Sequence, residues 1–421
     1  MAISAPYIGP RPFEQSDRDI FFGRTQEANE LVSLITAHPV VVLYAQSGGG
    51  KTSLVKAGLI PLLVDEESFD VLPPMRVREN VTGLKPEGVE NIYMFNALSS
   101  ISSPEEGNGF KKLTLTDYLE SPKAGNNGTS STPTVIIFEQ FEELFTLYPE
   151  HWEERAAFFM QVRDALRKFP LLRVLFSMRE DFIAELDPYA SLLPEKLRTR
   201  FRMEALREQT ALGAVTEPLK RVQTNGNGER RFAPGVAESL VTNLLDIKVR
   251  TPDGIKKVSG EFVEALQLQV VCQALWENLD PTDELITADH LEAYGDVDKA
   301  LMHFYENAIE KTITKTSIKQ GKLRQWVERT LITPNGTRGT VFRGDTETGG
   351  IPNAVVDELE NQRIIRMELR GGAQWYELTC WLQIKNGCWH VRRLNRLANV
   401  SKKELLTGIV TIVMRSIFWM T

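Results

Sequence analysis

The first half of the chain alternates uninterrupted apolar runs with helical patterns. Runs of strand length occupy residues 40–45, 134–138 and 172–178, and such runs are typical of strands buried on both faces of a sheet. A strand, a helix and a strand in this order predict a right-handed crossover, and therefore a parallel sheet flanked by helices. The helix between the last two runs is predicted over 151–169 from apolar residues at helical spacing: Trp152, Ala156, Phe159, Val162, Leu166 and Phe169.

Two more helices are predicted on either side of the first run. One begins at Thr25, a residue type that commonly caps helices, and continues through Leu34. The other begins at Thr52 and ends by Pro61, because proline has no N–H to donate inside a helix.

Two segments before the second run have weaker patterns. Residues 91–98 are almost entirely apolar and fit either a strand or a short helix. Residues 102–133 are rich in Ser, Gly, Asn and Pro, which predicts a solvated loop around one short helix at 110–119.

From about Leu206 onward the strand signals fade and helical patterns follow one another. Helices are predicted at residues 206–220, 234–246, 261–279, 287–312 and 322–331, with a polar break at 224–231. A helix at 354–361 is then surrounded by predicted strands at 338–343, 364–369 and 375–378. Helices followed by a hairpin with a tight Arg370-Gly371-Gly372 turn indicate a winged helix.

The first apolar run leads directly into a glycine-rich loop, Gln46-Ser47-Gly48-Gly49-Gly50-Lys51-Thr52-Ser53. Backbone N–H groups in such a loop form a nest for phosphate oxygens, and the following helix adds the positive end of its dipole. Lys51 can reach the terminal phosphates of a nucleotide, and the Thr52 hydroxyl can join the coordination of Mg²⁺. Ala45 stands where the usual G-x-x-x-x-G-K-[ST] pattern has its first glycine, which alanine can replace if its φ is negative. The alternative is a glycine-rich turn that holds no ligand.

Acidic residues follow the second apolar run. Glu139 comes directly after the strand, and Gln140, Phe141, Glu142 and Glu143 come next. Open α/β sheets bind their ligands at the C-terminal ends of core strands, and in P-loop proteins a carboxylate there holds the magnesium ion. An acidic loop without a ligand is the alternative.

Arg179 follows the third run and is predicted to lie on the same sheet edge as Lys51 and Glu139. An arginine at this edge can bind the terminal phosphate. It can equally pair with Glu180 or Asp181 in a structural role, and the sequence leaves both readings open.

Composition narrows the function classes. The chain has 421 residues and a net charge of −7, which argues against a general nucleic-acid binder. Three cysteines are too few and too odd in number for a disulfide framework. No charged and then apolar leader opens the chain, so a cytoplasmic location is expected and membrane attachment is not.

Several stretches, taken together and in order, resemble the novel STAND NTPases of bacteria. The resemblance spans about residues 6–379. It is carried by residues 6–13, 21–24, 47–59, 138–145, 179–182, 266–272, 294–297 and 375–379.

This resemblance implies a nucleotide-operated switch. An ATPase domain, a helical domain and a winged helix would close over ADP, and exchange for ATP would permit opening and assembly into a homo-oligomer. The implied cofactors are ATP or ADP with Mg²⁺. The loop residues from Ser47 to Ser53 would hold the phosphates, with Lys51 as the phosphate cation and Thr52 at the metal.

The resemblance also assigns roles outside the phosphate loop. Gly23 and Arg24 would lie near the adenine and ribose, and Pro218 would pack toward the base. Arg179 would take the sensor position. Glu139 would take the Walker B position, where the family has aspartate, and its extra methylene predicts slower hydrolysis. Either Glu142 or Glu143 would orient the attacking water.

The predicted fold class is an α/β P-loop NTPase followed by an α-helical domain and a winged-helix domain. The predicted function is an ATP/ADP-binding signalling switch with slow ATP hydrolysis, in bacterial signal transduction or anti-phage defence, whose trigger and effector the chain does not reveal. The predicted domains are an N-terminal adenine-side segment at 1–24, the P-loop NTPase domain at 25–205, the helical domain at 206–300, the winged helix at 301–379 and an atypical tail at 380–421.

The sequence after Thr379 departs from the family. Family members continue Glu-Leu-Thr with His-Asp-Arg, and that histidine contacts the ADP phosphate, whereas this chain continues Cys380-Trp381-Leu382. Residues 380–421 hold seven Lys or Arg against one Glu. We interpret them as a foreign or out-of-frame tail on a truncated family member, which would lack the phosphate latch. The apolar run at 405–420 is too short to span a membrane.

Two other functions are weighed against the switch. One is a remodelling ATPase that turns over constitutively. The other is a winged helix that binds DNA, which the acidic body of the chain disfavours. The winged-helix arginines are Arg338, Arg343, Arg363, Arg366 and Arg370, and they are predicted to pair with Glu358, Glu360 and Glu368.

Overall fold

The structure is a computed structural model that describes residues 5–78, 87–101, 110–121, 132–222, 230–251, 254–280, 282–334, 339–370 and 373–379. The chain divides into two compact units. The first contains the chain up to Leu244 and the segment Glu261–Leu291; the second contains Leu245–Gly260 and Glu292–Glu368. The predicted loops at 102–109 and 122–131, most of the polar break at 224–231, and the tail from 380 lie outside the described residues.

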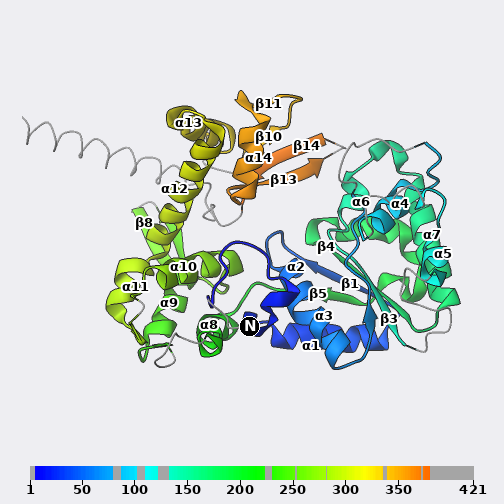
Figure 1. The fold of residues 1–421 in the computed structure, drawn as a ribbon, viewed down its shortest axis with the longest axis horizontal. Coiled ribbons are helices and arrows are strands. Elements are labelled where there is room, and N and C mark those ends of the chain that lie inside the picture. Colours follow the sequence, from blue (N-terminus) through cyan, green and yellow to red (C-terminus); the bar gives the residue numbers. More distant parts are fainter. Residues whose placement is uncertain are drawn as a thin grey trace, which may run out of the picture. The chain divides into compact units, whose positions relative to one another are not determined.

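A five-stranded parallel sheet forms the centre of the first unit (Figure 1). Its order is β2 (Asp70–Val71), β3 (Thr134–Phe138), β4 (Leu172–Arg179), β1 (Val40–Ala45) and β5 (Arg200–Arg202). The apolar runs form the three inner strands, and every neighbouring pair is parallel. The predicted parallel sheet is therefore confirmed. The edge strand β5 was not predicted, because its two arginines are exposed and leave no apolar run.

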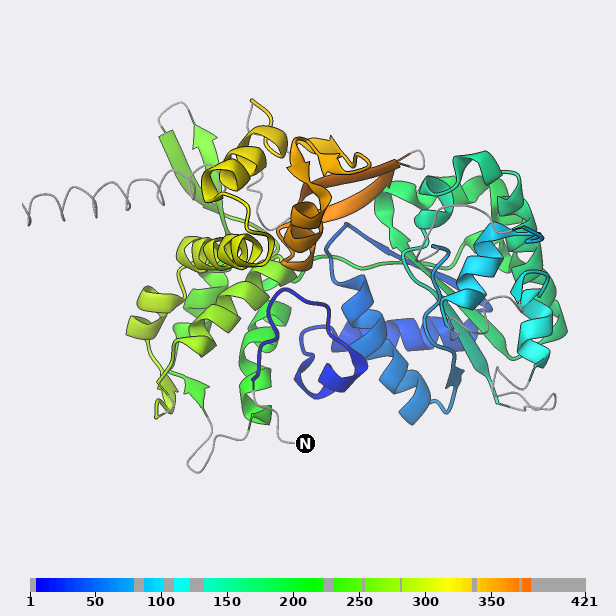
Figure 2. The same ribbon diagram turned by 45° about the horizontal axis from the view of Figure 1, so that its top comes forward.

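Helices cover both faces of this sheet (Figure 2). The side chains of β1 alternate between the two faces, as strand geometry requires. Val41 and Leu43 pack into a cluster with α1 (Thr25–Ala37) and the helix after the glycine-rich loop, and Val40 and Val42 pack into the opposite cluster. The opposite cluster includes residues of α4 (Ile92–Ser99), α5 (Leu115–Glu120) and α7 (Glu154–Lys168).

The helix after the glycine-rich loop is longer than predicted. It consists of α2 (Lys51–Ser53), a π-helical segment η2 (Leu54–Leu59) and α3 (Ile60–Asp65). The prediction that it ends by Pro61 was wrong. The preceding turns are π-helical, and the Ile60 N–H donates to the carbonyl of Val55, five residues earlier. This wider turn accommodates a proline that a regular α-helix would exclude.

Other boundaries also changed. Residues 91–98 form helix α4, capped by the Asn91 side chain, which accepts a hydrogen bond from the Met94 N–H at 2.9 Å. The predicted helix at 110–119 shortens to α5. Trp152 lies before α7 and is 58% exposed. The prediction that Trp152 belongs to the apolar face of this helix was therefore wrong. The short segments nearby are α6 (Glu143–Thr146), η5 (Pro149–His151), η6 (Glu180–Leu192) and η7 (Pro194–Leu197).

Mostly helical elements complete the first unit, as predicted. The helices are α8 (Glu208–Thr216), η8 (Glu217–Arg221), α9 (Val236–Leu245), α10 (Ala265–Glu277) and α11 (Ala288–Tyr294). Two short strands, β6 (Arg231–Phe232) and β9 (Leu285–Ile286), pair in parallel.

The N-terminal segment, residues 5–24 with the short helix η1 (Gln15–Ile20), connects these helices to the helix after the glycine-rich loop. The Tyr7 hydroxyl donates to the carbonyl of Val215 in α8 at 2.5 Å, and the Ile8 N–H donates to the side chain of Gln269 in α10 at 3.3 Å. At its other end, the Phe13 N–H donates to the Ser53 hydroxyl at 3.1 Å. The segment is thus held by residues far along the chain.

Gly23 is a close-packed point of this segment. Its φ is +85°, and a Cβ there would lie 2.6 Å from the Thr210 carbonyl oxygen in α8. We expect Gly23→Ala to destabilise the protein by roughly 1–3 kcal/mol, because a left-handed backbone and a clash with backbone are combined. The midpoint of urea unfolding measures the change.

Gly213 is the matched control for this prediction. It lies in α8, and a Cβ there would meet no atom within 4 Å. Gly213→Ala should therefore be neutral or stabilise by up to about 1 kcal/mol, the helix-propensity difference. Equal unfolding midpoints for Gly23→Ala and the wild type would contradict the close-packed description.

The second unit contains helices and a small antiparallel sheet. The helices are α12 (Val297–Thr316), α13 (Gln320–Thr330) and α14 (Asn353–Asn361), and the sheet has the order β10 (Thr340–Phe342), β14 (Ala373–Leu378), β13 (Ile365–Arg370). A further small pair is β11 (Glu347–Thr348) with β12 (Ile351–Pro352). Helices followed by this hairpin confirm the predicted winged-helix class.

One hairpin of this unit contradicts the expectation that strands are absent soon after Leu206. Strands β7 (Asp246–Thr251) and β8 (Gly254–Ser259) pair antiparallel along their whole lengths. In the sequence, Ile247 and Val249 alternate with Lys248 and Arg250. This is a two-residue period, but it is too short and too highly charged to stand out from the helical patterns around it.

Two of the winged-helix arginines, Arg343 and Arg366, are paired with acids, although with partly different ones than predicted. Arg343 pairs with Asp357, and Arg366 pairs with Glu377 and with Glu368. Glu358 pairs instead with Lys315 at 3.0 Å, because α14 packs against α12. Arg338 and the side chain of Arg370 lie outside the described residues.

Candidate phosphate and metal site

The glycine-rich loop has the backbone conformations that its glycines permit. Gly48 and Gly50 have φ values of +80° and +96°, which other residues rarely adopt. A Cβ on Gly49 would lie 3.1 Å from the Gln46 carbonyl oxygen, to which the Gly49 N–H donates. Ala45 is the last residue of β1, so its backbone is extended and its methyl group is tolerated in place of the usual glycine.

Lys51 lies at the start of the helix that follows this loop. Its Nζ donates to the carbonyl oxygens of Ala45 and Gln46 at 3.2 and 3.3 Å, which places the ammonium group at the C-terminal end of β1. Burial lowers the pKa of Lys51, the nearby Glu142 carboxylate raises it, and Arg179 lowers it further. Lys51, Glu142 and Arg179 therefore share one electrostatic environment.

Glu139 and Thr52 form the candidate metal site. Glu139 is 6% exposed, and its Oε1 is buried without a hydrogen-bond partner. Burial raises the pKa of Glu139, while Lys56, Arg76 and a hydrogen bond from Thr52 lower it. A buried carboxylate oxygen without a protein partner, next to a threonine hydroxyl, is a donor set that fits Mg²⁺.

The two glutamates that follow have different surroundings. The Glu142 Oε2 accepts a hydrogen bond from the backbone N–H of Arg179 at 3.1 Å, so Glu142 lies on the side of Lys51 and β4. The Glu143 side chain is 8% exposed and pairs with Arg76. Burial raises the pKa of Glu143, and Arg76 and Arg78 lower it.

Arg179 occupies the predicted sheet edge. It is the register partner of Ala45 across the β1–β4 pair. Its guanidinium pairs with Asp181 and lies 5.6 Å from the centre of the Phe182 ring. Of the two candidate acids, Asp181 is thus its partner in this structure, whereas Glu180 pairs with Arg202 at 3.2 Å.

The residues predicted to lie near the base come together in the same unit. Gly23 packs on α8, and Pro218 is buried near the start of η8, which follows α8 directly. Arg24 is 5% exposed, pairs with Glu27 at 2.5 Å, and has a buried Nη2 without a hydrogen-bond partner. Such a buried donor is consistent with a polar ligand near Arg24.

Arg76 is the site residue that sequence reasoning missed. It follows the short strand β2 and bonds the side chains of Gln140 and Glu143. The segment around it has no hydrophobic period, and the two residues of β2 are too few to be predicted as a strand, so no sequence pattern indicated Arg76.

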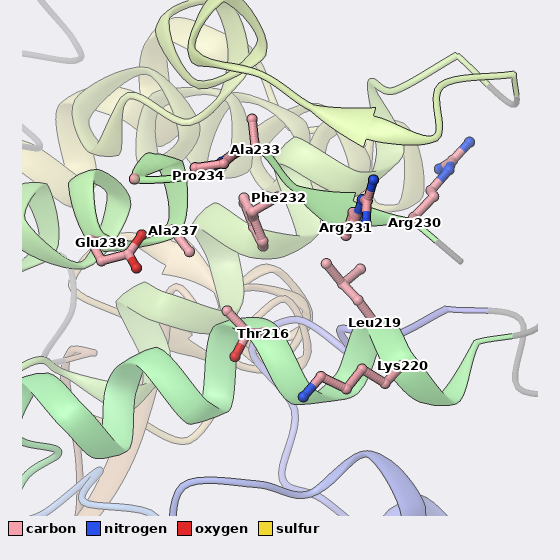
Figure 3. Close-up of a pocket in the computed structure, with 11 residues that line it drawn as sticks. Thr216, Leu219, Lys220, Arg230, Arg231, Phe232, Ala233, Pro234, Ala237 and Glu238 are labelled. Atoms are coloured by element: carbon pink, nitrogen blue, oxygen red, sulfur yellow. The ribbon is translucent and has the colours of Figure 1, made fainter. Parts of the chain in front are cut away.

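A pocket of about 340 Å³ lies elsewhere in the first unit, between the α8–η8 segment and the turn that leads from β6 into α9 (Figure 3). In Figure 3 the Phe232 ring points from this turn toward α8–η8, where Thr216, Leu219 and Lys220 face it. None of the predicted phosphate, metal or base residues lines this pocket. It is separate from the set around Lys51.

Within the described part of the chain, no group of three or more His, Cys, Asp or Glu residues could hold a metal ion by itself. None of the helices described is both long enough and apolar enough to cross a membrane. Cys380, Cys388 and His390 lie near one another in the sequence, although not at the spacing of a zinc site. These three residues lie outside the described residues.

The parallel sheet, the glycine-rich loop with Lys51-Thr52, and the acid after β3 define a P-loop NTPase. The sequence profile of the novel STAND NTPase 1 family matches residues 6–392, and the chain belongs to this family. The matched range extends beyond Thr379 into the segment that we interpret as a foreign tail.

Comparison with solved structures gives distant similarities. The ORC2 protein of Aeropyrum pernix in ADPNP-ADP complexes is 14% identical, with 90% of this chain and 95% of that chain covered and a TM-score of 0.44. The ORC1 protein of Aeropyrum pernix in complex with DNA is 12% identical, with 90% and 95% covered and a TM-score of 0.42. A Walker-type ATPase of Pyrococcus abyssi is 13% identical, with 91% and 98% covered and a TM-score of 0.38. No curated protein sequence matches the chain.

Proposed function

We propose that this protein is an ATP/ADP-binding signalling switch that hydrolyses ATP slowly, in bacterial signal transduction or anti-phage defence. One observation carries the proposal. A buried carboxylate with an unpartnered oxygen, Glu139, lies next to Thr52 at the sheet edge where the glycine-rich loop ends. The family membership supports the nucleotide, and the signalling role rests on the resemblance of the sequence.

Each residue of the site has a proposed part in binding. The backbone N–H groups from Gly48 to Gly50 donate to the phosphates, and Lys51 donates its ammonium protons to the terminal phosphate. Thr52 and Glu139 would hold Mg²⁺. The ion would neutralise phosphate charge.

Glu142 is better placed than Glu143 to orient water. The Arg179 backbone holds its carboxylate on the Lys51 side, whereas Glu143 is buried in its pair with Arg76. Hydrolysis would be slow because Glu139 is one methylene longer than the family's aspartate. The longer side chain would hold its carboxylate less firmly at the metal.

The residues near the adenine base would link the bound nucleotide to the conformation of the protein. Gly23, Arg24 and Pro218 would contact the adenosine through the N-terminal segment and η8. A nucleotide shifts a conformational equilibrium only if it contacts the two states differently. ADP would favour the closed state and ATP an open state that forms homo-oligomers. We also propose the five domains predicted from the sequence, at residues 1–24, 25–205, 206–300, 301–379 and 380–421.

The test is a titration of ADP, and of ATP with Mg²⁺, into the purified protein, together with an assay of phosphate release. We expect saturable binding of both, with turnover on the order of 10⁻³ s⁻¹, as in unassisted switch NTPases. Absence of ADP binding would contradict the proposal. Steady release of several phosphates per second without a partner would favour a remodelling ATPase instead.

A further inference from the structure

Residues 75–77, which follow β2, are held by hydrogen bonds on two sides. One side is the end of β3, and the other is helix α4 with the residue after it. The Met75 N–H donates to the Ile137 carbonyl at 2.8 Å, and the Met75 carbonyl accepts from the Glu139 N–H at 2.9 Å. On the other side, the Arg76 N–H donates to the Ser100 hydroxyl at 3.0 Å, and the Val77 carbonyl accepts from the Asn96 side chain at 3.1 Å. Arg76 therefore projects from a rigid backbone directly beside Glu139.

The turn after Glu139 has a conformation that needs support. Gln140 has a φ of +50°, a left-handed backbone conformation that residues other than glycine adopt only when the surrounding structure holds them there. The Arg76 Nη2 donates to the Gln140 Oε1 and also to the Glu143 Oε1. The guanidinium of Arg76 thus joins both ends of the turn. In the middle of the turn, the buried Phe141 ring packs against Phe176, with 4.4 Å between the ring centres.

The charges around this turn also favour the contact of Arg76 with it. The groups that act on Glu139 are Lys56 from the helix after the loop, Arg76, Glu14 from the N-terminal segment, and the Thr52 hydroxyl. Those that act on Glu143 are Arg76, Arg78 and Glu142. Arg76 is the only one of these cations that acts on both glutamates.

We propose that Arg76 is a positioning residue, which clamps the turn at 140–143 so that Glu139 faces Thr52 and Mg²⁺. This inference rests on the proposed nucleotide function and goes beyond it, because neither the phosphate-loop pattern nor the acidic motif includes this arginine. Arg76 acts through Glu139 and the turn and does not touch nucleotide.

The experiment measures ADP affinity by calorimetry, with Mg²⁺ and with EDTA, for the full chain. We expect Arg76→Gln to reduce the Mg²⁺-dependent gain in affinity by about tenfold, the scale of one lost charge interaction. Its affinity in EDTA should stay within about twofold of the wild type, since it keeps the phosphate loop.

The comparison of Mg²⁺ with EDTA separates positioning from a general loss of structure, which would weaken ADP binding in both conditions. Arg76→Lys keeps the charge but not the planar fork that joins Gln140 to Glu143. It should therefore restore only part of the Mg²⁺-dependent gain.

Two controls complete the design. Arg173→Gln removes an arginine that bonds the carbonyls of Pro170 and Leu172 at the opposite end of β4, and it should change none of these quantities. Arg76→Gln with Glu143→Gln removes both charges of this pair, so no buried carboxylate is left without its partner. The double variant should recover the fold if Arg76→Gln alone loses it.

The outcomes distinguish the two proposals. A full Mg²⁺-dependent gain in affinity in folded Arg76→Gln, or an equal loss of affinity in EDTA, would overturn the positioning role and leave nucleotide binding intact. A wild type that binds no ADP in either condition would overturn both.

Discussion

Lys51→Ala is expected to weaken ADP binding by roughly 100-fold or more, because it removes a charge-assisted hydrogen bond worth about 1.5–3 kcal/mol together with the long-range attraction of the cation. The ammonium group is held at the C-terminal end of β1 by the Ala45 and Gln46 carbonyls. It is therefore pre-positioned for a phosphate at this edge of the sheet. Isothermal titration of ADP measures the effect.

The control for Lys51→Ala is Lys168→Ala. Lys168 lies at the end of α7 and pairs with Glu120 on the surface, so its loss should leave ADP affinity unchanged. Burial lowers the pKa of Lys51, which means that the folded state holds this proton less tightly than the unfolded state does. Removing the side chain should thus not lower the melting temperature without nucleotide. Unchanged ADP affinity in folded Lys51→Ala would refute the phosphate site.

Glu139→Gln is expected to separate stability from activity. Glutamine keeps the shape of the side chain but not the charge that Mg²⁺ requires, so ATP hydrolysis should fall by about 100-fold or more, as when one preorganised electrostatic contact is removed. Without nucleotide the variant should be more stable than the wild type at neutral pH, because burying a neutral amide costs less free energy than burying an ionised carboxylate.

The sign of the stability change follows from the pKa of Glu139, which burial raises. A carboxyl group whose pKa is higher in the folded state binds more protons there, so the wild type loses stability as pH rises from the unfolded pKa through the folded one. Glutamine does not titrate. The advantage of Glu139→Gln in thermal unfolding should therefore be present at neutral pH and disappear in acid. A variant that is less stable than the wild type at both pH values would contradict this account.

The parts of the fold that could be predicted were those with a clear apolar pattern in the sequence. The inner strands β1, β3 and β4 are buried on both faces, so each appears as an uninterrupted apolar run, and the phosphate loop and acidic residues that follow them could be placed on one sheet edge. The winged helix was predicted from the order of its helices and hairpin.

The segments that could not be predicted had conflicting or absent patterns. Every residue of α4 from Ile92 to Leu98 is buried, so neither a strand period nor a helix period is visible there. Pro61 ended the predicted helix because sequence reasoning does not detect a π-helical turn. Arg76 was missed because its partners depend on a turn with a positive φ at Gln140, which no local pattern indicates.

The contacts of the N-terminal segment have a consequence for biosynthesis. Residues 7 and 8 bond Val215 and Gln269, which lie 208 and 261 residues later in the sequence. Contacts that are so distant in sequence form late. During translation the parallel sheet, whose last strand ends at Arg202, would therefore fold before the segment around residues 7 and 8 docks.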